Sequence, residues 1–463
     1  MNADRPIASP AEPGEGRRRA IVLVHNPVAP YSRALRIARS LRDDGWEVAI
    51  AGLARPDLPA QEADGDIRIY RAAPVGPLAR YVAAPGGRPA RVVAALDRVA
   101  AAAGRALARV PGLGLLGAAR TPTLRRVLGV LCWPLPARAW AAGLGEVLPP
   151  ADVFHACGVA ALVAASKLAP LARRKGRAGR VVYDVIDLFL EGNRYAALPR
   201  LWKGWYERRE RALVERADAV VTVNEALADE LARRWRLGEP PTVVRNCPPW
   251  SPPPAVPPRQ LRQACGLPES VRLVLFLGIL GPDRGILEAG EAVLRVPDAA
   301  FVALGFGPWY ERLRARDRDP RFAGRHVTLP AVAPDDVRDW VAGADAVIVA
   351  VPGDSLNQRL STPNKFWEGL TAGVPLVVGK DLLVMRRILE EHDLGVVADP
   401  RDPEGLAAAL RAVLDVPPEL RAARRRRALD LARELYRWDL EVGRYRLLVE
   451  RLVPPPGPQG TMR

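Results

Sequence analysis

A lysine and a glutamate three residues apart, in the stretch STPNKFWEGL (361–370), have the spacing that best predicts chemistry in this chain. Thr362 as a hydroxyl N-cap, followed by Pro363 at the first helical position, predicts a helix start. Lys365 then lies in the first turn, where the helix dipole disfavours a cation by roughly 0.3–1 kcal/mol unless an anion is bound. Glu368 shares its helical face and could accept hydrogen bonds from ribose hydroxyls. A surface Lys–Glu pair without function is the alternative.

Two glycine-containing loops extend this pattern. In FLGILGPDRGI (276–286), glycines follow a buried strand and Arg284 stands at the entry to a helix. In ALGFGP (303–308), Gly305 and Gly307 follow the next strand. Glycines permit close backbone approach, and an arginine offers a forked contact to phosphate. These two loops and the start of the helix with Lys365 follow strand ends, and together they predict a pocket for a nucleoside diphosphate.

The elements that must position these residues alternate between short β-branched runs and helical patterns. AIVLV (20–24) reads as a strand, SRALRIARSLRDDG (32–45) as an amphipathic helix and EVAIA (47–51) as the next strand. After the proline-rich stretch NCPPWSPPPAVPP the same alternation restarts. This pattern predicts an α/β protein of two doubly wound Rossmann-like domains facing a central cleft. The expected segments are a disordered tail (1–17), a first domain (18–245) with a basic helical insertion near 86–145, a linker (246–258), a second domain (259–435), and a crossing helix and tail (436–463).

The stretches FLGILGPDRGI, ALGFGP, GADAVIVAVP, STPNKFWEGLTAGVPLVV and LGVVADPRDPEGLAAAL, in this order, resemble the nucleotide-sugar-binding half of retaining family-4 glycosyltransferases of the GT-B fold. The first half, with HNP, DVFHACG and VVYDVIDLFLE, resembles the acceptor-side domain of the same family. The resemblance covers most of residues 20–435 except the basic insertion. It implies a nucleoside-diphosphate-sugar donor, transfer with retention at the anomeric carbon, and no required cofactor or metal.

Carried over residue by residue, the resemblance assigns Glu368 to the donor ribose and Arg284 and Lys365 to the diphosphate. Leu360 stands where the family's first motif glutamate is expected, and Ile279 replaces a usual arginine. The donor-binding candidates are Arg284, Lys365, Glu368, Asn364, Gly305 and Gly307, and the acceptor-side candidates are His155 and Arg33. Cys157 and Ile186 replace histidines that the family often has, and no catalytic group is assigned.

Charge and composition indicate the partners and the cellular location of the protein. The 463 residues carry a net charge of +16, and nine arginines against Asp97 alone give the segment 88–145 a charge of +8. Apolar stretches between these arginines favour an anionic membrane surface, with solvated helix arginines as the alternative. We expect no nucleic-acid partner, because no nucleic-acid motif accompanies the charge. Four widely spaced cysteines indicate reduced thiols, and no apolar run of 18 residues is present. We expect no signal peptide, because residues 1–17 are polar and rich in proline and glycine. The expected location is cytoplasmic, peripheral at the inner membrane face.

Together with the charge distribution, the resemblance implies a hexosyltransferase-type enzyme (EC 2.4) that transfers a sugar to a glycan or lipid-linked acceptor in polysaccharide biosynthesis. A non-catalytic GT-B-like protein that binds nucleotide or a partner enzyme is the alternative, and a sugar-nucleotide epimerase on the same architecture is a weaker one. Donor base and sugar, acceptor, linkage and oligomeric state stay open.

Overall fold

The computed structural model describes residues 17–28, 31–75, 133–192, 195, 198–254, 256 and 258–455. The predicted tail, except Arg17, and the part of the predicted basic insertion before Trp133 lie outside the described residues. In the described part, no helix has the length and apolar character needed to span a bilayer.

The first domain is built on an eight-stranded sheet in the order β3-β4-β2-β1-β5-β6-β7-β8. All pairings are parallel except that of β3 with β4. Its strands are β1 (Arg19–Val24), β2 (Glu47–Leu53), β3 (Gln61–Asp64), β4 (Ile67–Ala72), β5 (Val153–Cys157), β6 (Arg180–Val185), β7 (Ala219–Thr222) and β8 (Thr242–Val243). Its helices are α1 (Ser32–Asp43), α6 (Pro134–Val147), α7 (Val159–Arg174), the 3-10 turn η1 (Phe189–Glu191), α8 (Arg200–Val214) and α9 (Glu225–Trp235).

The second domain has a six-stranded, all-parallel sheet in the order β11-β10-β9-β12-β13-β14. Its strands are β9 (Arg272–Ile279), β10 (Ala299–Phe306), β11 (His326–Pro330), β12 (Ala346–Val349), β13 (Leu376–Gly379) and β14 (Gly395–Ala398). Its helices are α10 (Gln260–Cys265), α11 (Ile286–Val293), α12 (Tyr310–Arg316), the 3-10 turn η2 (Pro320–Phe322), α13 (Val337–Ala342), α14 (Leu356–Leu360), α15 (Asn364–Ala372), α16 (Leu383–Glu391), α17 (Pro403–Leu414) and α18 (Pro418–Glu434).

Helices cover both faces of both sheets, as parallel sheets buried on both sides require. In the first domain, α1 packs on one face and α6, α7 and α9 pack on the other. In the second domain, α11 and α17 cover one face while α13, α15, α16 and α18 cover the opposite one. The prediction of two Rossmann-like domains is therefore confirmed.

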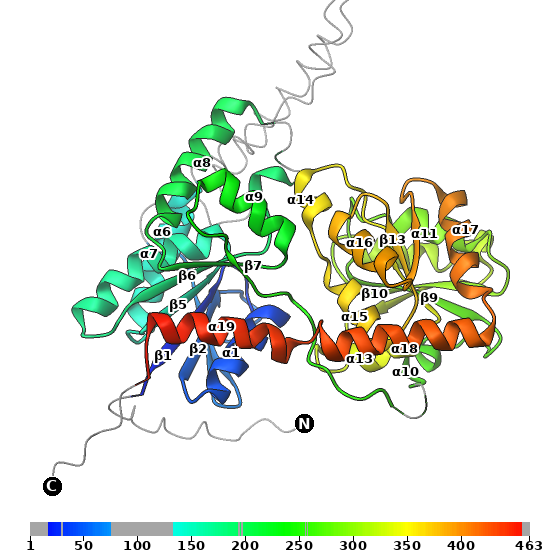
Figure 1. Ribbon diagram of the computed structural model, residues 1–463, viewed down its shortest axis with the longest axis horizontal. Coiled ribbons are helices and arrows are strands. Elements are labelled where there is room, and N and C mark those ends of the chain that lie inside the picture. Colours follow the sequence, from blue (N-terminus) through cyan, green and yellow to red (C-terminus); the bar gives the residue numbers. More distant parts are fainter. Residues whose placement is uncertain are drawn as a thin grey trace, which may run out of the picture.

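The last helix, α19 (Trp438–Leu452), connects the two domains. It follows α18 of the second domain but lies on the first, beside α1 (Figure 1). Tyr445 and Val449 are buried in the apolar core of the first domain, and the Trp438 indole N–H donates to the Ser40 hydroxyl at 2.8 Å. Because α19 belongs to the core of the first domain, the two domains are tied together at the end of the chain as well as through the linker.

Candidate functional site

A cleft of about 740 Å³ lies between the domains. Its lining comes from the carboxyl ends of strands on both sides, with Ile186 after β6 and Val223 after β7 facing Gly278 in β9 and Val351 after β12. Parallel α/β sheets bind ligands at this edge. The topology thus brings the donor-side and acceptor-side edges predicted from the sequence to one cavity.

The glycines of the second domain let two loops approach each other. A Cβ at Gly305 would lie 1.9 Å from the Gly278 carbonyl oxygen, and one at Gly307 would lie 2.4 Å from that of Leu280. Only glycine fits such contacts without moving the backbone. Gly305 lines the cleft, whereas Gly307 is not among its lining residues. Gly305 therefore contributes directly to the cleft, whereas Gly307 allows the backbone beside it to pack closely against Leu280.

The helix that carries the predicted pair begins one residue later than the sequence indicated. Pro363 has an extended ψ of 136° and occupies the N-cap position, so α15 starts at Asn364. The expectation that Thr362 caps this helix is wrong: its side chain makes no cap hydrogen bond and its buried hydroxyl has no partner among the described residues. Lys365 is the second helical residue, still in the first turn, where the dipole argument holds.

Lys365 is a buried cation without a polar partner. Its side chain is 5% exposed, its Nζ makes no hydrogen bond to a described residue, and it lies 3.4 Å from the centroid of the Phe276 ring. Burial, and then the positive charge of Arg284, lower the pKa of Lys365 well below its usual value. An ammonium group held in this way gains most from an anion in the cleft.

Arg284 is the second cation of this edge. It is half-buried, lines the cleft and forms no ion pair with any carboxylate in the described part of the chain. Burial lowers its pKa, while the charges of Asp187 and Asp283 oppose that effect. The structure thus places Arg284 and Lys365 in one cleft as two mutually repelling positive groups, an arrangement that favours a bound anion.

Glu368 is engaged by the opposite domain. This buried carboxylate lies 3.4 Å from the guanidinium of Arg36 on α1. Burial raises the pKa of Glu368, and the charge of Arg36 opposes the shift. Arg36 also donates to the Asn246 side-chain oxygen at 2.9 Å, and the Asn246 amide donates to Asn364 at 2.7 Å. A hydrogen-bonded chain from α1 to α15 therefore crosses the cleft at the predicted ribose position.

Arg36 and Asn246 were not predicted from the sequence. Arg36 lies on a helix that carries several arginines, and Asn246 only marks the start of the proline-rich stretch. The spacing could have indicated Arg36, because it lies one helical turn after the candidate Arg33 and both residues line the cleft. Nothing else in the sequence indicates that Arg36 and Asn246 contact the second domain.

Leu360, which stands at the position of the first motif glutamate, lies in an apolar contact between the domains. Its side chain is 7% exposed and packs into the core cluster of the first domain, with Leu356 beside it. The Asn224 amide donates to the Leu360 carbonyl at 2.8 Å, and the Asn357 side-chain oxygen accepts from the Leu188 backbone N–H at 2.6 Å. The helix α14 thus seats on the first domain, and Leu360 itself does not line the cleft.

The acceptor-side candidates form a buried cluster around Asp184. Arg33 donates to both oxygens of this carboxylate, at 2.6 and 2.8 Å. His155 is fully buried between Asp184, at 3.1 Å, and the hydroxyl of Tyr445 on α19, at 3.0 Å. Arg33 touches the lining of the cleft but is only 2% exposed, whereas His155 is not among the lining residues. The charge of Arg33 and the hydrogen bond from His155 hold the pKa of Asp184 well below its usual range although burial acts to raise it.

His155, Cys157 and Asp184 also place three potential metal-ligand atoms within 4.8 Å of one another. Both Asp184 oxygens already accept from the Arg33 guanidinium, so a metal cation there would face a fixed positive charge. The chemistry of this donor set fits a structural ion pair better than a metal centre.

Comparison with known proteins adds a family match in the second domain. Residues 271–415 match the model of the family described as "Glycosyl transferases group 1". The matched segment runs from β9 to α17 and contains Arg284, Lys365 and Glu368. A search of curated protein sequences finds no match to this chain.

Solved structures of similar fold match both domains of this chain. Sucrose-phosphate synthase from Thermosynechococcus elongatus aligns with a TM-score of 0.60 at 16% identity, over 94% of this chain and 99% of that one. HepE from Anabaena, in complex with UDP, aligns at 0.58 and 15% over the same shares. A UDP-forming α,α-trehalose-phosphate synthase from Burkholderia xenovorans, in complex with glucose-6-phosphate, aligns at 0.59 and 15% over 93% and 100%. The fold is GT-B, and the matches together support a glycosyltransferase.

Proposed function

We propose that the protein transfers a hexosyl group, with retention, from a nucleoside-diphosphate sugar to a glycan or lipid-linked acceptor in the interdomain cleft. The observation that carries the proposal is the buried Lys365 ammonium, which lacks a partner among the described residues and lies in one cleft with Arg284 and Glu368. A diphosphate supplies the missing negative charge, and ribose hydroxyls supply donors for the carboxylate. The family match over this domain and the UDP bound by HepE support this choice of ligand.

In this proposal the second domain assists departure of the nucleoside diphosphate. Negative charge grows on the diphosphate oxygen as the bond to the anomeric carbon breaks, and Lys365, Arg284 and the N-terminus of α15 stabilise it. These groups are already oriented, so little reorganisation accompanies the reaction. No covalent enzyme nucleophile and no metal are part of this mechanism. The acceptor hydroxyl approaches from the side of the first domain, its oxygen forms the new bond on the same face of the sugar, and its proton passes to the departing diphosphate oxygen.

Donor binding has to compete with the contact between Arg36 and Glu368. At 3.4 Å this ion pair is long, and ribose hydroxyls can replace or share it. We propose that Arg36 holds the empty carboxylate and is released or shared when donor binds. Closure of the domains over the donor then excludes water and suppresses hydrolysis.

The proposed setting is polysaccharide biosynthesis at the cytoplasmic face of the inner membrane. Its support is the charge of the segment 88–145, which lies in the acceptor-side half of the chain. An anionic lipid surface concentrates such a protein near lipid-linked acceptors.

A panel of UDP-, GDP-, ADP- and dTDP-sugars tests the proposal. We expect one base series to raise the melting temperature, and its sugar nucleotide to be hydrolysed slowly or transferred when acceptor lipid is added. Leu360 at the motif position favours a second candidate, a non-catalytic nucleotide-binding or partner protein. Such a protein would bind a nucleotide but give neither hydrolysis nor transfer with any donor.

A further inference from the structure

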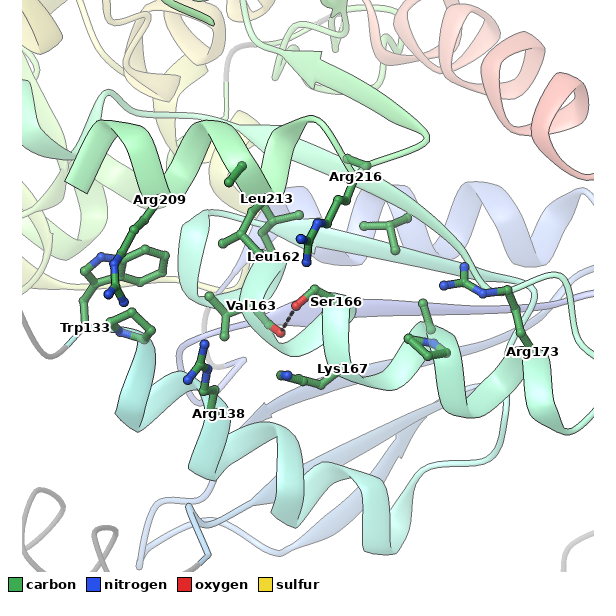
Figure 2. A pocket seen from close by; sticks show the side chains of 16 residues that line it. Trp133, Arg138, Leu162, Val163, Ser166, Lys167, Arg173, Arg209, Leu213 and Arg216 are labelled. Carbon is green, nitrogen blue, oxygen red and sulfur yellow. Dashed lines mark hydrogen bonds between the residues drawn. The ribbon is translucent and has the colours of Figure 1, made fainter. Parts of the chain in front are cut away.

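A second cavity, of about 640 Å³, lies on the outer face of the first domain between α6, α7 and α8. We call it the basic groove. It shares no lining residue with the interdomain cleft, so it is a separate feature of the molecule. Figure 2 shows it with Trp133 at one end and Arg173 at the other.

Five cationic side chains line the basic groove and no carboxylate does. They come from all three helices and the turn after α8, and are Arg138, Lys167, Arg173, Arg209 and Arg216. None of the five forms an ion pair with a carboxylate in the described part of the chain, although arginines just outside the groove do, such as Arg180 with Asp218. Figure 2 shows Arg138, Lys167 and Arg216 directed toward the same space between the helices. Like charges gathered in this way favour a bound anion.

The floor of the groove is apolar, with Leu162 and Val163 on α7 and Leu213 on α8. At one end, the indole N–H of Trp133 is buried and has no hydrogen-bond partner among the described residues. Leu162 and Val163 are buried, but Leu213 in the groove and Leu201 at the start of α8 are accessible. Cationic side chains beside accessible leucines match an amphiphile, whose phosphate meets the cations and whose hydrocarbon contacts the leucines.

The beginning of α8, next to the groove, has the composition of a membrane interface. Leu201 is 73% exposed, Trp202 and Trp205 are half-buried, and Arg209 stacks over the Trp205 ring at 4.1 Å. Tryptophan and basic residues favour the level of lipid headgroups. Because Arg209 lines the groove and also contacts Trp205, this end of α8 adjoins the groove.

We propose that the basic groove binds the phosphate headgroup of an anionic membrane phospholipid and so docks the first domain on a bilayer. The proposal deepens the membrane location in the proposed function, but it does not depend on the transfer reaction. It assigns docking to residues that are distinct from the donor-binding residues.

The test measures co-sedimentation of the full chain with vesicles of phosphatidylcholine alone or with about 30% phosphatidylglycerol. The variant is Lys167→Gln/Arg216→Gln, in which both side chains are exposed, so the fold should be retained. Each cation near an anionic surface contributes about 1 kcal/mol, so two losses correspond to roughly 30-fold weaker binding. The matched control, Arg314→Gln/Arg318→Gln, removes two exposed charges from the second domain and should bind like wild type.

Three results would overturn the docking surface. Wild type could fail to prefer the anionic vesicles, or the groove variant could bind them as well as the control variant does. Alternatively, glycerol phosphate could raise the melting temperature of wild type but not of the groove variant, with no vesicle binding, which would identify a soluble ligand. Nucleotide binding is measured separately on the same variants, so failure of the donor site and failure of the groove give different results.

Discussion

At the scale of single residues, the cleft depends on charges that the fold leaves uncompensated. Lys365 is buried beside Arg284 and the Phe276 ring rather than beside a carboxylate. Such an arrangement destabilises the empty protein and stabilises an anionic ligand, so binding and stability should respond to mutation in opposite directions.

The variant Lys365→Met tests this opposition. We expect nucleoside-diphosphate affinity to fall about 10- to 150-fold, the loss of a charged hydrogen bond of about 1.5–3 kcal/mol. The free energy of unfolding without ligand should stay equal or rise, because the buried ammonium is gone. Calorimetric titration and urea unfolding measure the two quantities. The control Lys380→Met removes an exposed lysine paired with Asp399, and should leave affinity unchanged.

The lowered pKa of Lys365 also predicts a pH dependence. Between its folded pKa and 10.5, the unfolded chain binds a proton that the folded protein lacks, so this residue makes stability rise with pH through that window. The stability difference between wild type and Lys365→Met should therefore narrow as pH rises toward 10.5. Denaturant unfolding of both proteins at several alkaline pH values measures this difference. A difference in the free energy of unfolding that grows with pH would contradict the lowered pKa of Lys365.

The cluster around Asp184 leads to a different expectation, because its charges are paired. Asp184→Asn leaves Arg33, which is 2% exposed, without its carboxylate, and should cost about 3–5 kcal/mol of stability. Asp64→Asn, which breaks a more exposed pair with Arg39, should cost at most about 1 kcal/mol. Denaturant unfolding of both variants makes the comparison, and equal small losses would show that the cluster does not support the fold.

At the scale of elements, α14 is where the structure departs from what the family resemblance implies, because it carries Leu360 at the position of the first motif glutamate. Sequence reasoning placed the strand ends, the glycine loops and the face shared by Lys365 and Glu368, because these follow from periodicity and local chemistry. It could not show that α14 packs its leucines into the other domain, since that contact joins residues more than 100 positions apart. For the same reason, Arg36 and Asn246 were missed.

The variant Leu360→Glu restores the glutamate pair of the family motif in the sequence, but we expect it to destabilise the protein by several kcal/mol. The new carboxylate would lie in the apolar core of the first domain, without a partner. Ser361→Glu is the matched control, because Ser361 lines the cleft and a carboxylate there can reach water. Thermal unfolding decides between them, and a stable, more active Leu360→Glu protein would refute this view of α14.

At the scale of the whole molecule, the two GT-B domains are joined by the linker, by α19, by α14 and by the polar contacts that Arg36 makes with Asn246 and Glu368. The first three connections are covalent or packed in an apolar core, whereas the fourth is a long ion pair with hydrogen bonds. The fourth connection is thus the one that a donor can replace. This places the response to donor at the cleft and leaves the outer faces, including the basic groove, unchanged.

The central claim is that Glu368 holds the ribose while Lys365 holds the diphosphate. The most direct test is calorimetric titration of wild type and Glu368→Gln with the nucleoside diphosphate that binds best and with its 2′,3′-dideoxy form. We predict that Glu368→Gln lowers the affinity for the ribose-containing ligand about 10- to 150-fold. The affinity for the dideoxy ligand, which is already weaker, should stay nearly the same, because that ligand forms no ribose hydrogen bond with either wild type or the variant. Equal losses for both ligands, or none for either, would contradict the claim.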